Sequence, residues 1–320
     1  MEPEGKSLLN RFPVSAAETG RLLLSSYGQF LFSDRLFTGA AMALGLALIS
    51  DTALFFSGLG ILFGCGAAAI TNRDRQKIRK GFYGFNGGLF GLFWSWYFQG
   101  SAISLLLFVV FAAVLAFGQI AWERLWRPDR TGIPMGSLPA ALFFLFLLYP
   151  LYGITVQWRW LPAATLYLPL GAEFKPLIEL PLLQSDGLAF LGEHYLHAWV
   201  VILSGVLFHS RIGFGAALYG LAMGWILTRL WPVSADAAPV VFIAFNALPL
   251  AMAFGGLFLA ATPKGFLFMN AALLVCGLIW AASTMLLNRL HLPYLTLPFN
   301  LTFIGGLAWL RAGGRGQAQF

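Results

Sequence analysis

Two prolines interrupt an apolar stretch close to the C-terminal end of the chain, at residues 292–300 (LPYLTLPFN). Proline has no backbone N–H and breaks the hydrogen-bond ladder of a helix. Lipid offers no replacement partners, so a break at membrane depth is tolerated only where protein or a water-filled cavity covers the freed carbonyls. The stretch therefore predicts the wall of an internal cavity rather than a helix that faces lipid.

The composition places this cavity inside a membrane protein. Of the 320 residues, 59% are hydrophobic and 10% are charged, whereas a soluble domain carries about 25% charged residues. A span takes about 20 residues, which leaves room for roughly ten helices in one polytopic domain. The net charge of +7 comes from short basic loops between apolar runs. This pattern is typical of membrane orientation by positive loops and does not indicate a nucleic-acid partner.

The apolar runs divide into two sets of five. The predicted spans are residues 36–50, 53–70, 81–99, 102–122 and 133–153, and then 199–209, 213–230, 240–261, 265–287 and 292–310. Polar residues interrupt a weaker apolar segment before each set, at residues 21–37 and 188–198, and we expect each of these to be a tilted or re-entrant helix. The predicted domains are an N-terminal tail (1–20), a first repeat (21–153), a Pro-rich linker (154–187), a second repeat (188–311) and a C-terminal tail (312–320).

Matching residues recur at a nearly constant offset along the chain. Residues 133–140 (IPMGSLPA) share the aliphatic, Pro, two residues, hydroxyl, Leu, Pro pattern of the later stretch at residues 292–299. Phe85-Asn86 recurs as Phe245-Asn246 at almost the same offset, and Gln29 and Glu193, one in each interrupted segment, are separated by only slightly more. Three matches in the same order indicate an internal repeat.

The charges predict how the two repeats are oriented. The loop at residues 73–80 holds five basic residues and should face the cytoplasm. With both tails inside, most other basic loops fall on the cytoplasmic side, while the acidic linker falls outside. Five spans per half then require the second half to run opposite to the first. The predicted fold class is all-α and polytopic, with two inverted repeats of five transmembrane helices, each with a re-entrant tilted helix, around a central pore.

The chain carries no sign of a metal, a cofactor or a catalytic group. Cys65 and Cys276 lie far apart in apolar segments, so we expect packing residues rather than a disulfide or a metal site. His194 and His197 are close in sequence and have no third ligand nearby. The first 19 residues lack the apolar core of a signal peptide.

At three segments the chain resembles the urea transporter family. These are residues 28–32 (GQFLF), residues 83–89 (YGFNGGL) and, most specifically, residues 292–300. The similarity in layout runs from about residue 21 to residue 311. It implies inverted five-helix halves around a pore, a homotrimer, and a channel-like facilitator that lets urea run down its gradient. The expected location is the plasma membrane of a bacterium, its inner membrane, with lipid and urea as partners and no nucleic acid.

The resemblance also implies roles for nine residues that would bind the solute. A flat, neutral solute needs a slot with apolar walls and a row of acceptors that replaces its water. The wall candidates are Phe32, Phe85, Leu89, Leu196 and Phe245. The acceptor candidates are the hydroxyls of Ser137 and Thr296, helped by carbonyls freed near the prolines, with Gln29 and Glu193 near the mouths or buried beside the filter. The sequence departs from the family pattern at Ser137, Ala140 and Pro249, where the family has Thr, Phe and Leu.

Several alternatives stay open on the sequence alone. Each hydroxyl could bond the carbonyl four residues earlier in its own helix, each phenylalanine could face lipid, and Asn86 and Asn246 could join helices rather than contact a solute. The departures at Ala140 and Pro249 admit ammonia, water or short amides as the solute. Ion-coupled transport would need an intramembrane carboxylate, for which Glu193 is the candidate. A membrane enzyme is disfavoured, because the spans hold no paired carboxylates and no Ser/His/Asp set.

Overall fold

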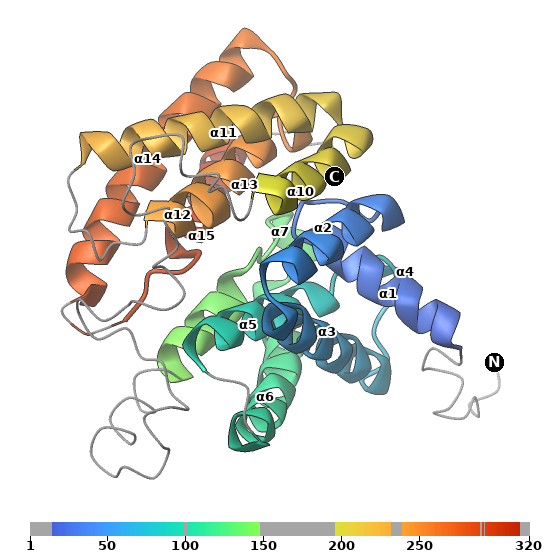
Figure 1. The fold of residues 1–320 in the computed structure, drawn as a ribbon. Helices are drawn as coiled ribbons and strands as arrows, with labels where there is room; N and C mark the ends of the chain where they lie inside the picture. Colours follow the sequence, from blue (N-terminus) through green and yellow to red (C-terminus); the bar gives the residue numbers. More distant parts are fainter. Residues whose placement is uncertain are drawn as a thin grey trace.

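A computed structural model describes residues 15–98, 102–147, 196–231, 239–288, 290 and 292–313, and these residues are helical with connecting turns (Figure 1). The helices of the first half are α1 (Ala16–Gln29), α2 (Leu36–Ile49), α3 (Asp51–Ile70), α4 (Arg75–Arg79), α5 (Gly84–Tyr97), α6 (Ala102–Trp126), α7 (Pro128–Thr131) and the helix Leu138–Leu147. The second half has α10 (Leu196–His209), α11 (Arg211–Leu230), α12 (Pro239–Phe242), η7 (Ile243–Ala247), α13 (Leu248–Met252), η8 (Ala253–Leu257), α14 (Pro263–Asn288) and α15 (Leu297–Ala312).

The two halves lie side by side and meet along α2 and α10. In Figure 1 the blue to green helices occupy one side and the yellow to red helices the other, with α2 packed on α10 between them. The Thr38 hydroxyl donates to the Gly205 carbonyl at 3.1 Å. A Cβ on Gly45 would lie 2.3 Å from the Ile202 side chain, and a Cβ on Gly205 would lie 2.7 Å from that of Ala41. Small residues on both helices therefore allow the halves to approach closely.

Most of the helix positions predicted from the apolar runs are confirmed. One serine separates α2 from α3, and another separates α10 from α11. In both pairs a helix of 14 residues is followed by one of 20 residues. Ser50 caps α3 by accepting from the Ala53 N–H at 3.2 Å, and Ser210 caps α11 by accepting from the Gly213 N–H at 3.0 Å. Both caps satisfy backbone donors that a helix start leaves free.

Two predicted spans begin later than the sequence suggested. The spans predicted at residues 133–153 and 292–310 become helical at Leu138 and at Leu297. Pro139 and Pro298 sit in the first turn, where a missing N–H costs nothing, and the residues before each helix are not helical. The prolines therefore start helices here instead of interrupting them.

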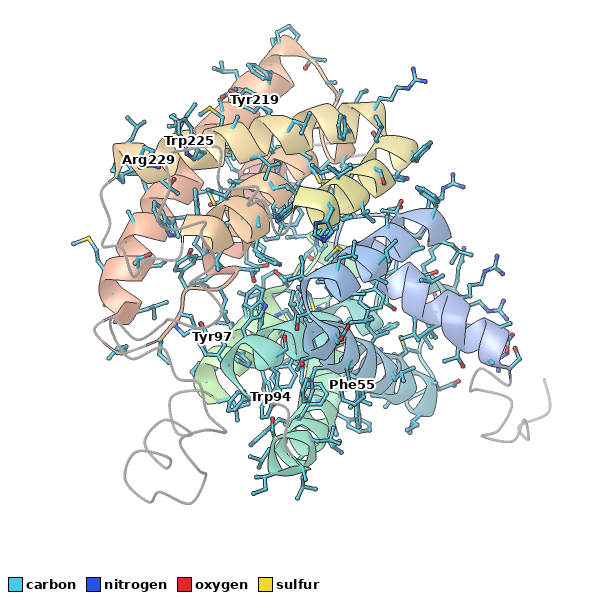
Figure 2. The ribbon with its side chains drawn as sticks, in the orientation of Figure 1. Phe55, Trp94, Tyr97, Tyr219, Trp225 and Arg229 are labelled. Atoms are coloured by element: carbon cyan, nitrogen blue, oxygen red, sulfur yellow. The ribbon has the colours of Figure 1, made fainter. Side chains whose placement is uncertain are left out.

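Three described helices are long and apolar enough to cross a membrane, and four more apolar helices are shorter. The long ones are Asp51–Ile70, residues 102–131 and residues 263–287. Large apolar side chains also lie on the outer surface, among them Phe55, which is 54% exposed (Figure 2). Outward-facing apolar side chains on helices of this length are what lipid accommodates and water does not. The described part of the chain therefore has the character of a helical membrane protein.

Glycines bring α3 and α5 into direct backbone contact. A Cβ on Gly87 would lie 2.1 Å from the Gly60 carbonyl oxygen, and a Cβ on Gly64 would lie 2.2 Å from that of Tyr83. The matching contact in the second half is looser, because a Cβ on Gly220 would lie 2.9 Å from the Ala247 carbonyl oxygen. Gly60, Gly64 and Gly87 therefore allow α3 and α5 to pack closely.

The helix that follows α11 is irregular at the proline that the sequence marked as a departure. Pro249 has no N–H to offer the carbonyl four residues earlier, and its ring clashes with that carbonyl. The chain responds with the π-helical turn η7, in which the Leu248 N–H donates to the carbonyl of Ile243, five residues earlier. A second π-helical turn, η8, ends where the Phe258 N–H reaches Ala253 at 2.8 Å. In the first half, α5 is a regular α-helix.

Candidate functional site

A cavity of about 990 Å³ lies between the two halves and is lined by residues from both. Seven of the nine predicted site residues line it: Gln29, Phe32, Phe85, Leu89, Ser137, Phe245 and Thr296. Glu193 lies outside the described residues, and so does the side chain of Leu196, the residue at which α10 begins. The structure thus brings residues from five separate segments together at one cavity.

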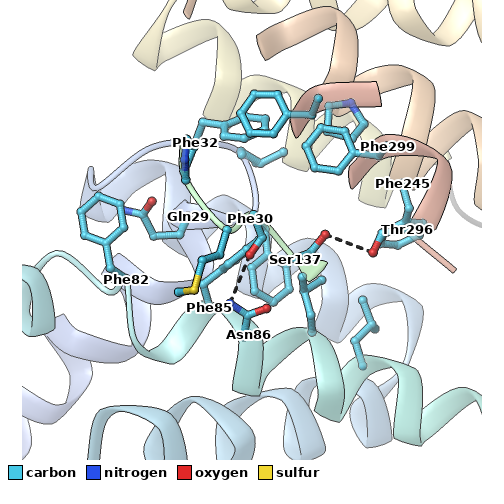
Figure 3. A pocket seen from close by; sticks show the side chains of 18 of the residues that line it. Gln29, Phe30, Phe32, Phe82, Phe85, Asn86, Ser137, Phe245, Thr296 and Phe299 are labelled. Carbon is cyan, nitrogen blue, oxygen red and sulfur yellow. Dashed lines mark hydrogen bonds between the residues drawn. The ribbon is translucent and has the colours of Figure 1, made fainter. Parts of the chain in front are cut away.

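The two hydroxyls at matching positions of the repeat meet directly. The Ser137 hydroxyl donates to Thr296 Oγ1 at 3.0 Å (Figure 3), and the two residues are 2% and 3% exposed. Among the described residues neither hydroxyl bonds the carbonyl four residues earlier, so that alternative is wrong for both. In the view of Figure 3 the pair lies between the rings of Phe299, above, and Phe30, below.

Asn246 explains why the Thr296 hydroxyl is free to face the cavity. Thr296 is the N-cap of α15, a position where a hydroxyl usually accepts from the N–H three residues on. Here Asn246 takes that N–H, because its Oδ1 accepts from the Phe299 N–H at 2.9 Å. Its Nδ2 donates to the Leu295 carbonyl at 2.9 Å, which fixes the turn before the helix. The asparagine therefore caps α15 from a neighbouring helix, and the threonine hydroxyl makes no capping bond.

Asn86 holds the first-half turn in the same way. Its Oδ1 accepts from the Ala140 N–H and its Nδ2 donates to the Gly136 carbonyl, both at 3.2 Å. Ala140 stands three residues after Ser137, as Phe299 does after Thr296. The prediction that Asn86 and its second-half counterpart join helices is confirmed, and in both cases the bond joins a helix to a backbone turn at the cavity.

The residue before each hydroxyl adopts a left-handed backbone. Gly136 has φ +58° and Leu295 has φ +47°. Glycine takes this conformation freely, whereas a leucine in it is strained by about 1–2 kcal/mol. Strain of this kind persists only where the surroundings hold it in place. The asparagine bonds to the Gly136 and Leu295 carbonyls supply that hold.

Aromatic rings wall the cavity, including several that the sequence analysis missed. Phe85 packs edge-on against Phe30 with ring centroids 5.6 Å apart, and Phe245 packs against Trp96 at 5.1 Å. Phe30 lies in the GQFLF segment and could have been named from it. Trp96 could not, because no repeat or motif marks it.

Phe32 reaches across from the first half to the second. It follows α1 in a turn with φ +55°, and its ring centroid lies 6.0 Å from that of Phe258 and 6.3 Å from that of Phe299. Phe299 lies in the LPYLTLPFN stretch, but the sequence analysis did not assign it. Phe32 therefore lines the cavity, with ring partners that only the tertiary structure identifies.

Charged residues from three neighbouring segments also line the cavity. The Lys77 ammonium lies 3.1 Å from the carboxylate of Asp129 and 4.0 Å from that of Glu123. The Tyr83 hydroxyl donates to both carboxylate oxygens of Glu123, at 3.2 Å each. These contacts join the basic loop after α3 to α6 and α7. They form a polar part of the cavity lining in which each of these charges has a partner.

Gln29 lies next to the basic loop and not beside the hydroxyl pair (Figure 3). Its Nε2 donates to the Lys80 carbonyl at 2.7 Å. Gln29 is the last residue of α1, and its side-chain oxygen takes no part in this bond. Gln29 therefore lines the cavity next to the basic loop, and its place near a mouth stays a prediction.

The described residues hold no group of three or more His, Cys, Asp or Glu side chains that could bind a metal. Both cysteines are buried and free. A family model described as "Urea transporter" matches residues 21–310. No curated protein matches the chain.

Proposed function

The chain belongs to the urea transporter family, and on that premise we propose that it is a passive, channel-type facilitator of urea in the plasma membrane. Proteins of this family carry urea across membranes and are not enzymes, so the prediction that the chain is not an enzyme is confirmed. The observation that carries the channel proposal is the hydroxyl pair of Ser137 and Thr296, buried between aromatic rings in a cavity shared by the two halves.

The chemistry of urea fits this arrangement. Urea is flat and neutral, and removing its hydrogen bonds to water without replacement costs several kcal/mol. Aromatic walls such as Phe85 and Phe299 admit a flat molecule between ring faces and edges, and hydroxyls at the slot replace the lost water bonds. In this proposal the paired charges flank the mouth, and the hydroxyls and rings surround the middle of the cavity. A neutral solute can therefore enter past charges and cross a section that offers neutral partners.

We infer that residues 21–153 and 188–311 are inverted repeats related by a pseudo-twofold axis. Two observations support this inference. The helices α10 and α11 follow α2 and α3 at a constant spacing in the sequence, and at the same spacing Asn246 repeats the hydrogen bonds of Asn86. Two equivalent hydroxyls that touch each other must lie on either side of such an axis. The expected axis passes between Ser137 and Thr296 and between α2 and α10. Residues 1–20, 154–187 and 312–320 remain the expected tails and linker, and the homotrimer and the bacterial inner membrane remain predictions from the family resemblance.

Stopped-flow light scattering on proteoliposomes tests the proposal. We expect urea to equilibrate faster than in empty vesicles, at a rate that saturates only at high urea concentration. Imposed proton or sodium gradients should leave the rate and the final distribution unchanged, because a passive pore couples to no ion. Accumulation of urea against its gradient, driven by either ion, would show that the protein is a coupled transporter instead.

A further inference from the structure

Asn300 lies beside the hydroxyl pair and has no counterpart in the other half. It is fully buried in the first turn of α15. Its Nδ2 lies 2.9 Å from Ser137 Oγ and 3.2 Å from Thr296 Oγ1. The residue at the matching position of the first half is Ala141, which cannot form hydrogen bonds through its side chain. One asparagine, which does not itself line the cavity, therefore contacts both hydroxyls.

The orientation of the Asn300 amide follows from a third contact. Nδ2 lies 2.8 Å from the backbone carbonyl of Thr296, and a carbonyl can only accept a hydrogen bond. The amide nitrogen must therefore face that carbonyl and the two hydroxyls. The amide oxygen, Oδ1, is buried with no hydrogen-bond partner among the described residues. It lies beside Gly136, where a Cβ would come within 2.8 Å of it.

Counting protons shows what the pair can offer to a solute. One Nδ2 proton goes to the Thr296 carbonyl, and the other goes to the hydroxyl pair. The Ser137–Thr296 bond uses one of the two hydroxyl protons. The second hydroxyl proton cannot go to Asn300, because the side of the amide that faces the pair is its NH2 group. Among the described residues no other acceptor is bonded to either hydroxyl, so this proton is left for the cavity that both residues line.

We propose that Asn300 is a positioning residue that makes the hydroxyl pair a hydrogen-bond donor to the carbonyl oxygen of the solute. Asn300 donates a hydrogen bond to the two hydroxyl oxygens and so occupies a lone pair on them. Its NH2 group offers the hydroxyl protons no acceptor, so these protons do not turn toward Asn300. The inference rests on the proposed function, because it takes urea as the solute. It changes the role expected of Ser137 and Thr296, which donate to the solute as well as accept from it.

A donor at this point matters for the choice of solute. A slot lined only with acceptors satisfies the N–H groups of urea and leaves its carbonyl bare, which is costly in a dry site. Thiourea has nearly the same flat shape, but its sulfur is a weak acceptor. A donor at the slot therefore favours urea over thiourea, and losing that donor should affect urea more.

The test is the urea and thiourea permeability of proteoliposomes that carry Asn300→Leu. Leucine has a similar branched shape and no hydrogen-bonding groups. It would leave the Thr296 backbone carbonyl, which Asn300 now occupies, free to accept a hydroxyl proton and draw it away from the cavity. We expect urea permeability to fall about tenfold, the effect of one lost hydrogen bond of ordinary strength, and thiourea permeability to fall less. The urea-to-thiourea ratio should therefore fall as well. An equal loss for both solutes, which leaves the ratio unchanged, would indicate a purely structural role and overturn the proposal.

A second set of variants keeps the test valid if Asn300→Leu folds poorly. Ser137→Ala combined with Thr296→Val leaves Asn300 in place but removes both hydroxyl protons, and it should lower the ratio to a similar extent. Adding Asn300→Leu to that pair should change the ratio little further, because Asn300 acts through the hydroxyls. A wild-type ratio in the pair variant, or a full additional effect of Asn300→Leu, would overturn the proposal. Failure of the wild-type protein to conduct urea at all would instead contradict the proposed function.

Discussion

Proteoliposomes carrying the double variant Ser137→Ala, Thr296→Val are expected to lose urea permeability by roughly 10- to 100-fold, the combined effect of two or three missing hydrogen bonds. The two hydroxyls are buried polar groups at the cavity between the halves. Each single variant should have a smaller effect, since each leaves one hydroxyl facing the cavity. Stopped-flow light scattering measures all three rates in vesicles of matched protein content.

A matched control replaces two buried hydroxyls elsewhere. Ser95 and Thr284 each donate to a backbone carbonyl of their own helix, at 2.7 Å and 2.8 Å, and neither lines the cavity. Ser95→Ala with Thr284→Val should therefore keep the wild-type urea rate. Equal losses in both double variants would mean that buried hydroxyls matter only for folding, and the slot would have to be sought elsewhere.

Asn246→Leu is expected to destabilise the protein strongly and to slow urea flux. The Asn246 side chain bonds the Val241 and Leu295 carbonyls and the Phe299 N–H, at 3.2, 2.9 and 2.9 Å. Leucine would leave these buried backbone groups unpaired, at a cost of about 2–4 kcal/mol. The strained turn at Leu295 would lose the hydrogen bond that keeps it in place, and the Thr296 hydroxyl would become the nearest cap for α15. We expect a lower melting temperature in detergent, together with the slower flux in proteoliposomes.

Asn270→Leu is the control for this variant. Asn270 lies on α14, where it bonds the Phe266 carbonyl and the Tyr219 hydroxyl, away from the cavity. Its replacement should lower the melting temperature less and leave urea flux near the wild-type rate. If Asn246→Leu behaves like Asn270→Leu in both measurements, Asn246 does not hold the turn that presents Thr296.

The order and bounds of most helices could be predicted from the sequence because lipid imposes long apolar runs. Leu36–Ile49 and Leu196–His209 are such runs, predicted at residues 36–50 and 199–209, although α10 begins three residues earlier than predicted. The hydroxyl pair could also be predicted, since Ser137 and Thr296 occupy the same place in two copies of one pattern. A repeat identifies equivalent residues even where no single segment is decisive.

Other features depend on contacts that no local pattern encodes. Asn246 takes the capping role of Thr296 only because α15 starts beside η7 in the folded chain. The left-handed Leu295 could not be predicted, because leucine rarely adopts that conformation and tertiary bonds hold it there. Trp96 and Phe258 became wall residues through packing between segments. The start of α15 was placed too early because Pro298 was interpreted as breaking a helix, whereas it begins one.

The position of a bound urea analogue tests the central claim most directly. Selenourea keeps the flat shape of urea and carries an atom that anomalous X-ray scattering locates in a crystal. The account predicts a selenium peak inside the cavity between the two halves, beside the hydroxyls of Ser137 and Thr296 and against the ring of Phe85 or Phe299. Selenium bound only outside this cavity, with the hydroxyl pair empty at saturating concentration, would contradict it.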